Sequence, residues 1–262
     1  MKWYRIKTII LRHLLQYPRD LGRLSMLFYW PLIDIVIIGF TIVWLKNMNA
    51  ISENLERVTL ASILLWQVIV RSNLDISGNL LEEIWSHNMN NFFSTPITLA
   101  EWMMAMIILS FNLSLLVFVY IGFLSWLFYS FNVLSLGWIL VPIFLQLYIS
   151  GMAMGFFAAS VLVYFGVRVQ SIVFMMGYLL MPLSAVSYEL NALPTTARYI
   201  AHLLPMSYIF EFLREYILNS VFNWQLFNSA LALNCIYFSA SLLCFYYMFE
   251  KSREKGLARL VD

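Results

Sequence analysis

The sequence predicts an all-α integral membrane protein with six transmembrane helices, an amphipathic interfacial helix before the first of them and short re-entrant helices before the last. Hydrophobic residues make up 62% of the 262 residues and charged residues only 11%, whereas a soluble domain carries about 25% charged residues. The apolar residues form long unbroken runs, which excludes the alternating strands of a membrane β-barrel. A chain of this length provides about six helices of 20–25 residues joined by short loops.

The amino-terminal stretch, residues 2–19, is predicted to be an amphipathic helix lying on the membrane. Its apolar side chains recur at spacings of three and four, as on one face of a helix: Trp3, Ile6, Ile10, Leu14 and Tyr17. The opposite face carries Arg5, Arg12 and Arg19. A helix with a basic face of this kind is suited to an anionic cytoplasmic leaflet.

The long apolar runs predict the membrane spans in order along the chain. They lie at about residues 24–45, 58–80, 99–129, 137–165, 171–187 and 225–249. The fifth span is the least regular, because Pro182 interrupts it after about a dozen residues. Residues 182–222 are too charged and too rich in proline to cross the membrane alone, so we expect an outer re-entrant segment there.

The distribution of basic residues predicts the orientation. Lysines and arginines are concentrated before the first span and in the tail, residues 250–262, so both termini are expected in the cytoplasm of a multi-pass protein of the inner (cytoplasmic) membrane. This arrangement requires an even number of spans. The stretch 80–96 then also lies in the cytoplasm, yet it contains acidic and no basic residues, which suggests a basic partner. With a net charge of only +2, the chain offers no extended basic surface for nucleic acid.

Three charged residues fall within predicted spans: Asp34, Arg71 and Asp75. Charges in a membrane usually face protein or water and pair with one another. Asp34 and Arg71 lie at similar depth, and Asp75 follows Arg71 by one helical turn. We therefore expect an ion pair between Asp34 and Arg71, with Asp75 as a second partner, that clamps the first two spans together. A proton or ion relay is the alternative interpretation.

The chain is rich in aromatic residues, many of which belong to the belts at the two membrane interfaces. Tyr29 and Trp30 precede Pro31 inside the first span, and Trp66 lies inside the second. These rings are candidates for lining a substrate path, with simple packing as the alternative.

Motifs for catalysis or cofactor binding are absent from the sequence. No phosphate-binding loop G-x-x-x-x-G-K-[ST] and no nucleophile elbow G-x-S-x-G occurs. The histidines at 13, 87 and 202 lie on different predicted segments without second ligands, which argues against a zinc site. We expect the chain not to be an enzyme and to bind no cofactor itself.

Three stretches together resemble the permease subunits of the ABC type-2 exporter family, and the likeness covers almost the whole chain. The first, residues 12–40, has a basic lead-in, Pro18 and a span with Pro31; the second, residues 80–105, contains Pro96 and Glu101. The third, residues 181–215, is the most specific. Its characteristic order is Pro182, Pro194, Pro205, Tyr208 and Arg214.

The resemblance implies six spans per subunit, a dimer with a second permease copy, and two copies of a separate ATPase subunit that bind ATP and Mg²⁺. It implies that residues 80–96 form a coupling region that docks onto the ATPase, with contacts at Glu82, Glu83, Ile84, Trp85, His87 and Asn88. It also implies a gate helix at the amino end beside the ATPase. The outer re-entrant segment would close the exit, through Pro182, Pro194, Pro205, Tyr208 and Arg214.

These features predict export of a hydrophobic or amphipathic substrate, such as a drug, lipid or peptide, by alternating access. Export of a polysaccharide or glycolipid by a permease of the same family is one alternative. A membrane scaffold or regulator without transport activity is another, and a neighbouring reading frame encoding an ATPase would argue against it. A secondary transporter is disfavoured, because the sequence shows no inverted repeat with paired broken helices.

Overall fold

The computed structural model describes residues 1–89 and 95–256, and every regular element within these ranges is a helix. The all-α class predicted from the sequence is thereby confirmed. Residues 90–94 of the predicted coupling region and 257–262 of the tail lie outside the described residues. The α-helices are α1 (Trp3–Gln16), α2 (Leu21–Leu24), α3 (Trp30–Asn47), α4 (Glu53–Trp85), α6 (Leu99–Tyr129), α7 (Leu140–Phe165), α8 (Ser171–Leu179), α9 (Thr195–Ala201), α10 (Pro205–Asn219) and α11 (Trp224–Glu254).

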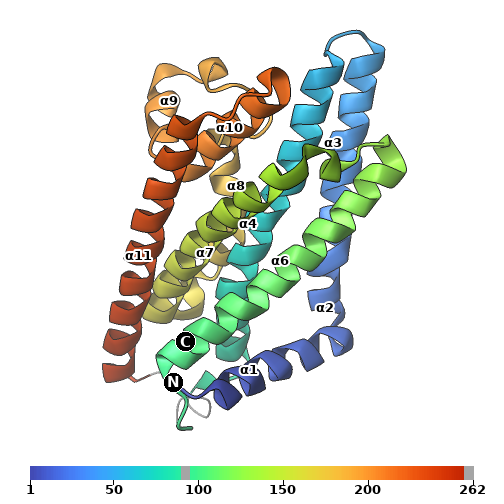
Figure 1. The fold of residues 1–262 in the computed structure, drawn as a ribbon. Helices are drawn as coiled ribbons and strands as arrows, with labels where there is room; N and C mark the ends of the chain where they lie inside the picture. The colour runs from blue at the N-terminus through green and yellow to red at the C-terminus, as the bar shows by residue number, and fades with distance from the viewer. Residues whose placement is uncertain (90–94, 257–262) are drawn as a thin grey trace.

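The long helices form an elongated bundle (Figure 1). Helix α4 packs along α7 and α6, and α7 in turn packs along α11. Helix α1 lies across one end of the bundle, against α6, whereas α9 and α10 lie at the opposite end. Helix α1 begins and α11 ends at the same end of the bundle (Figure 1).

Four helical stretches within the described residues are long and apolar enough to cross a membrane. They are Leu21–Asn47, Leu99–Tyr129, Val133–Val169 and Trp224–Glu254, and they overlap four of the predicted spans. Helix α4 is long enough but carries many polar residues, and α8 is too short, since nine residues extend only about 14 Å. The helix expected over 171–187 ends at Leu179, before Pro182.

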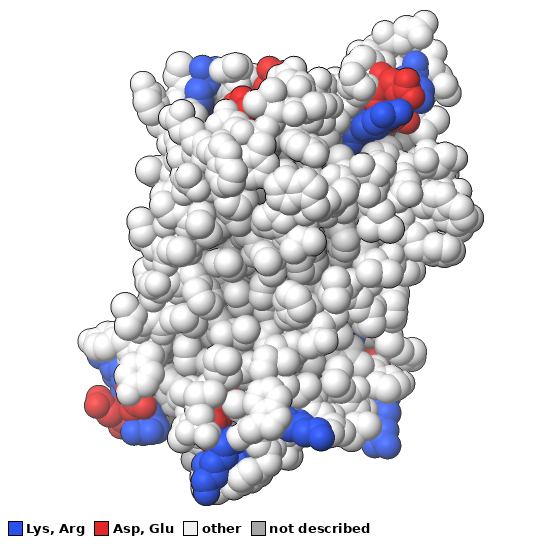
Figure 2. Space-filling model, viewed as in Figure 1, with Lys and Arg blue, Asp and Glu red and all other residues white. Residues whose placement is uncertain are grey.

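Charged side chains on the visible face of the molecule occupy its two ends, and the band between them shows none (Figure 2). An uncharged belt between two charged ends matches a protein surrounded by lipid, because exposed charges are costly in hydrocarbon. The fold therefore supports a multi-pass membrane protein.

The close packing of α4 and α7 depends on two glycines. Gly151 and Gly155 of α7 face Ile69, Ser72 and Asn73 of α4. A β-carbon at Gly151 would overlap the Ser72 hydroxyl and lie 2.7 Å from the Ile69 carbonyl oxygen. The G-x-x-x-G spacing thus lets two helix backbones approach closely, as is common in membranes.

Helix α1 forms as predicted, but its inward face differs from the predicted stripe. Ile9 and His13 are buried with Ile6 and Tyr17, whereas Trp3 and Leu14 are exposed. The apolar arc of α1 is wider than one stripe, so one part of it packs on the bundle while the other remains available to lipid.

The chain makes a π-helical turn at Ser25–Tyr29, directly before α3. Pro31 explains this turn, because proline has no backbone N–H to donate to the carbonyl four residues earlier. The wider turn accommodates the missing hydrogen bond, and such turns often occur at functional sites.

Candidate functional site

One row of buried polar side chains runs along α4. Its members stand four residues apart: Gln67, Arg71, Asp75, Asn79 and Glu83. At 1.5 Å per residue the row extends about 24 Å along the helix. Buried polar groups are costly unless they are hydrogen-bonded or paired, so the position of each partner shows which elements the row connects.

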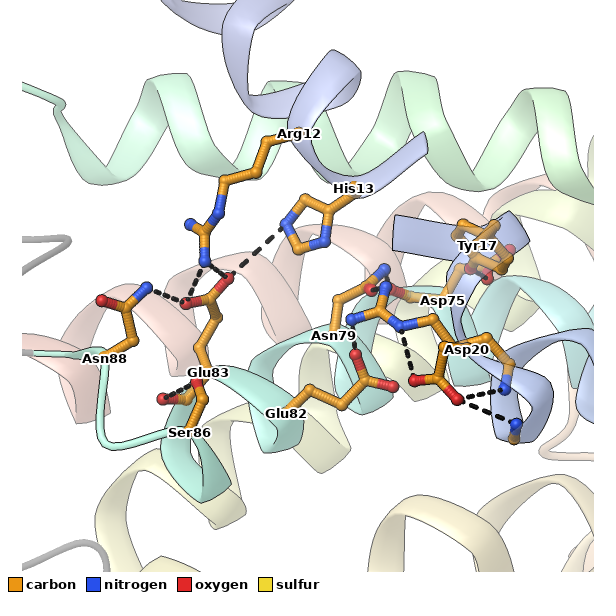
Figure 3. A network of polar contacts seen from close by, with 12 residues as sticks. Arg12, His13, Tyr17, Asp20, Asp75, Asn79, Glu82, Glu83, Ser86 and Asn88 are labelled. Atoms are coloured by element: carbon orange, nitrogen blue, oxygen red, sulfur yellow. Dashed lines mark hydrogen bonds and ion pairs between the residues drawn. The ribbon is translucent and has the colours of Figure 1, made fainter. Parts of the chain in front are cut away.

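At the α1 end, three side chains lie around Glu83, and two of them bind its carboxylate (Figure 3). Arg12 approaches a carboxylate oxygen of Glu83 to 2.7 Å, and the Asn88 amide donates to the same carboxylate at 3.0 Å. The imidazole Nε2 of His13 lies 3.9 Å from it. Glu83 therefore joins the last turn of α4 to α1.

Arg23 connects the neighbouring turn of α4 to the segment after α1. It forms ion pairs with Glu82 and, at 3.6 Å, with Asp20. Its Nη1 also donates to the Asn79 side-chain oxygen at 3.2 Å. The Asp20 carboxylate in addition caps the first turn of α2 by accepting from backbone N–H groups.

The amino end of α1 is attached to α6 through Glu101. This carboxylate accepts the backbone N–H of Lys2 at 2.7 Å and lies 3.4 Å from the Arg5 guanidinium. Glu101 also completes a capping box with Thr98 at the start of α6. Helix α1 is thus fixed to α4 and to α6 by charged contacts.

Deeper in the bundle, Arg71 pairs with Asp75 on its own helix. The guanidinium donates twice to the carboxylate, with Nε to Oδ2 at 2.9 Å, and donates to the Tyr17 hydroxyl at 2.9 Å. Tyr17 in turn donates to Asp75 at 3.0 Å. The side chain of Tyr17 thereby ties the end of α1 to the middle of α4.

The expected ion pair between Asp34 and Arg71 is wrong. Asp34 instead accepts a hydrogen bond from the Gln67 amide at 2.8 Å. Gln67 precedes Arg71 by one turn of α4, so the estimated depth of the Asp34 partner was wrong by one turn. The Arg71 guanidinium pairs with Asp75 instead. The partnership of Arg71 with Asp75 is confirmed.

His13 is buried between α1 and α4, and neither ring nitrogen has a hydrogen-bond partner among the described residues. Burial, together with the positive charges of Arg23 and Arg12, lowers the pKa of His13 to about 3. The nearby Glu83 does not offset this, because its carboxylate is already paired with Arg12. His13 is therefore neutral at physiological pH.

Two adjoining cavities border the polar row. A cavity of about 630 Å³ lies between the segment from α1 to the π-helical turn and α4, and Tyr17, Arg23 and Asn79 are in its wall. A second cavity, of about 240 Å³, lies deeper and is lined by α3, α4, α6 and α8. Arg71 belongs to the wall of both cavities.

The residues predicted to contact an ATPase divide into two groups. Glu83 and Ile84 are buried within the chain, and Glu82 and Asn88 are partly buried and engaged by Arg23 and Glu83. Trp85 and His87 are exposed at the end of α4, where the Trp85 indole donates to Gln170 at 3.0 Å. The outward-facing side chains are thus Trp85 and His87, and the acidic residues bind the chain's own arginines.

Of the three predicted path aromatics, Tyr29 and Trp30 lie together and Trp66 lies apart from them. Trp30 lines the deeper cavity. Tyr29 is exposed and its ring contacts that of Trp30 at 5.9 Å between centroids. Trp66 is buried and packs on Phe210 of α10, with 6.0 Å between ring centroids.

The predicted outer-gate residues lie on or near α9 and α10, the helices at the end of the bundle opposite α1 (Figure 1). Arg214 of α10 donates to the carbonyl oxygens of Ala185 and Tyr188, at 3.1 and 2.7 Å, and so holds the irregular segment after α8. The three prolines stand where helices begin or end: Pro182 lies in the turn Met181–Leu183, Pro194 precedes α9 and Pro205 begins α10. The rings of Tyr208 and His202 are in contact and connect α10 to the end of α9.

Sequence reasoning found Arg71 and Asp75 but missed Gln67, Asn79, Tyr17 and Arg23 as members of the same network. The spacing of four from Gln67 to Glu83 was the available signal, because it places polar residues along one row of a helix. Arg12, Tyr17 and Arg23 are each more than fifty residues from their partners on α4, and no local pattern specifies such contacts.

Among the described residues, no group of three or more histidine, cysteine, aspartate or glutamate side chains is arranged to hold a metal ion. No protein-family model and no curated protein matches the chain.

Proposed function

We propose that the chain is the transmembrane permease subunit of an ATP-driven exporter of the ABC type-2 kind. In this proposal it crosses the inner membrane six times, forms a dimer, and is driven by two copies of a separate ATPase on the cytoplasmic side. The chain carries out no bond chemistry. It provides a path whose inward-open and outward-open states are populated according to the nucleotide state of the partner.

The six crossings comprise the four apolar stretches, the polar helix α4 and the broken passage that begins with α8. Helix α4 is long enough for a crossing, since 33 residues extend about 50 Å. Its polar residues are tolerated because its neighbours α6 and α7 cover it on several sides. The common end of α1 and α11 supports an even number of crossings, with both termini in the cytoplasm (Figure 1).

The observation that carries the proposal is the polar row of α4, which connects the end of the bundle near α1 with its interior. At one end, Glu83 is held by Arg12 of α1. At the other, Gln67 is bonded to Asp34 of α3. A displacement imposed at the end of α4 is thus communicated through paired side chains to the helices that border the cavities.

The docking face in this proposal consists of the exposed residues Trp85 and His87. Glu82 and Glu83 serve a different role, because their ion pairs with Arg23 and Arg12 make α1 and the end of α4 move as one body. At the opposite end, the segment after α8 is held to α10 by the hydrogen bonds of Arg214. In this proposal it closes the exit in the inward-open state.

The test is association with an ATPase. The tagged chain is purified in a mild detergent together with candidate ABC ATPases, and the bound ATPase is quantified. We expect stoichiometric binding that Trp85→Ala with His87→Ala reduces at least tenfold. The control is Trp126→Ala, which changes an exposed tryptophan near the end of α6.

Failure of any ATPase to bind the folded wild-type chain contradicts the proposal and favours a scaffold. Equal binding by the double variant contradicts the assignment of the docking face alone.

A further inference from the structure

Asp34 lies within a candidate span without a cation to balance it. Its Oδ2 accepts from Gln67 at 2.8 Å, and no lysine, arginine or histidine among the described residues forms an ion pair with it. Its other oxygen, Oδ1, accepts no hydrogen bond from the part of the chain that the structure describes. Because a carboxylate on a membrane-spanning helix is costly without a counter-charge, a cation bound beside Asp34 would be stabilised there.

The nearest cation, Arg71, does not supply that charge. Its guanidinium binds Asp75 through two nitrogens and Tyr17 through one of them. Arg71 and Asp75 together are neutral, so this pair supplies no net positive charge to the Asp34 carboxyl group.

The cavity of about 240 Å³ lies next to the residues around Asp34, although Asp34 itself is not in its wall. Gln67, which holds the Asp34 carboxylate, is in its wall, and so are Trp30 and Pro31, which precede Asp34 by about one turn of α3. Phe174 and Tyr178 of α8 provide two further rings. An uncompensated carboxylate beside several aromatic faces is the environment that binds ammonium groups, through Coulomb attraction and cation–π contacts.

We propose that this cavity binds an organic cation, meaning a molecule with an ammonium group on an apolar body. The ammonium group approaches Asp34 and the faces of Trp30 and Tyr178, and the apolar body contacts Phe174, Leu74 and Val117. The larger cavity, which shares Arg71, Met26, Leu74 and Phe174 with it, leads from the α1 end of the bundle toward the site. That this cation is exported rests on the proposed function, whereas its binding to the purified chain does not.

The test uses the purified full chain in dodecyl maltoside and measures binding by isothermal titration calorimetry. The probes are hexyltrimethylammonium and hexanesulfonate, which share chain length and differ in the sign of the charge. We expect saturable binding of the cation only, weakened about tenfold or more by Asp34→Asn, as loss of a close charge partner implies. The matched control is Glu53→Gln, which removes an exposed carboxylate from the start of α4.

Trp30→Leu is the second variant, because Trp30 is half-exposed and its loss leaves the Asp34 charge in place. We expect this variant to weaken cation binding. It serves as the test of the site if Asp34→Asn lowers the thermal stability of the chain. Absent or equal binding in wild type and both variants overturns the inference and identifies Asp34 as a protonated structural residue. If the ATPase still binds in that case, the proposed function stands; if the cation binds and no ATPase does, only the proposed function fails.

Discussion

Arg71 and Asp75 show how a charged pair is accommodated in the interior of this bundle. Both side chains are buried, and Tyr17 bonds to both of them. Such a pair contributes little net stability, since its desolvation offsets its attraction, but an unpaired member is costly. Its role here is to fix the end of α1 on α4.

Removing one member of the pair tests this account. We expect Arg71→Leu to lower the free energy of unfolding by about 3–5 kcal/mol, because Asp75 is left buried and uncompensated. The double variant Arg71→Leu with Asp75→Leu recovers most of that loss. Denaturant unfolding in detergent measures both, with the exposed pair residue Arg57→Leu as a control that changes stability by less than about 1 kcal/mol. A double variant no more stable than Arg71→Leu contradicts the account.

His13 makes stability depend on pH. Its pKa is about 3 in the folded chain and about 6.5 when unfolded, so the unfolded state binds more protons between these values. Stability is therefore full above pH 6.5 and falls as the pH decreases toward 3. From pH 7 to pH 5 we expect a loss of about 2 kcal/mol from this residue.

Thermal unfolding at the two pH values checks this expectation. The loss disappears in His13→Leu and persists in His87→Gln, which changes an exposed histidine. Identical pH dependence in wild type and His13→Leu would show that the imidazole is not sealed between α1 and α4.

At the scale of the elements, the approach of α7 to α4 depends on Gly151. We expect Gly151→Ala to destabilise the chain by about 1–3 kcal/mol, because the added methyl overlaps Ser72 and the backbone at Ile69. Gly78→Ala is the matched control, since a β-carbon there meets nothing within 4 Å and alanine favours helix. Thermal unfolding compares the two variants, and equal stability of Gly151→Ala and wild type would exclude the close contact.

The helix boundaries in the structure, compared with the predicted spans, show which elements can be predicted from the sequence. The apolar runs predicted four of the helices well, because long hydrophobic stretches depend on local composition alone. For the fifth run, the predicted range 171–187 extends beyond α8, which ends at Leu179, before Pro182. Helix α4 is predicted as a span but carries many polar residues. A polar helix is buried because neighbouring helices cover it, and the hydropathy of a segment contains no information on which helices pack against it.

The candidate site was predictable only in part for the same reason. Arg71 and Asp75 were paired correctly because they are one turn apart on a single helix. The bonds from Gln67 to Asp34 and from Tyr17 to Arg71 join distant segments. Depth along a helix restricts such partners to within about a turn but does not give the helix rotation that selects one of them.

At the scale of the whole molecule, the uncharged belt separates an end with α1 from an end with α9 and α10 (Figures 1 and 2). With Cys235 and Cys244 changed to alanine, single cysteines at Ser86→Cys and Asn191→Cys report on these two ends. We expect a membrane-impermeant maleimide to label Asn191→Cys in intact cells and Ser86→Cys only after permeabilisation. Labelling of both in intact cells would contradict the proposed orientation.

The proposed dimer and the proposed ATPase partner also concern the whole molecule. Side-chain contacts hold α1 to α4 and α6, so the end of the bundle that carries Trp85 and His87 is a single body. A partner that moves this body moves Arg71 and Gln67 with it, through the polar row of α4.

ATP hydrolysis by the partner, with and without this chain in lipid nanodiscs, tests the central claim most directly. The account predicts that the wild-type chain changes the hydrolysis rate of the ATPase several-fold and that Trp85→Ala with His87→Ala abolishes the change. A hydrolysis rate that is the same with the wild-type chain, the double variant and empty nanodiscs would contradict the claim that this chain is an ATP-driven permease.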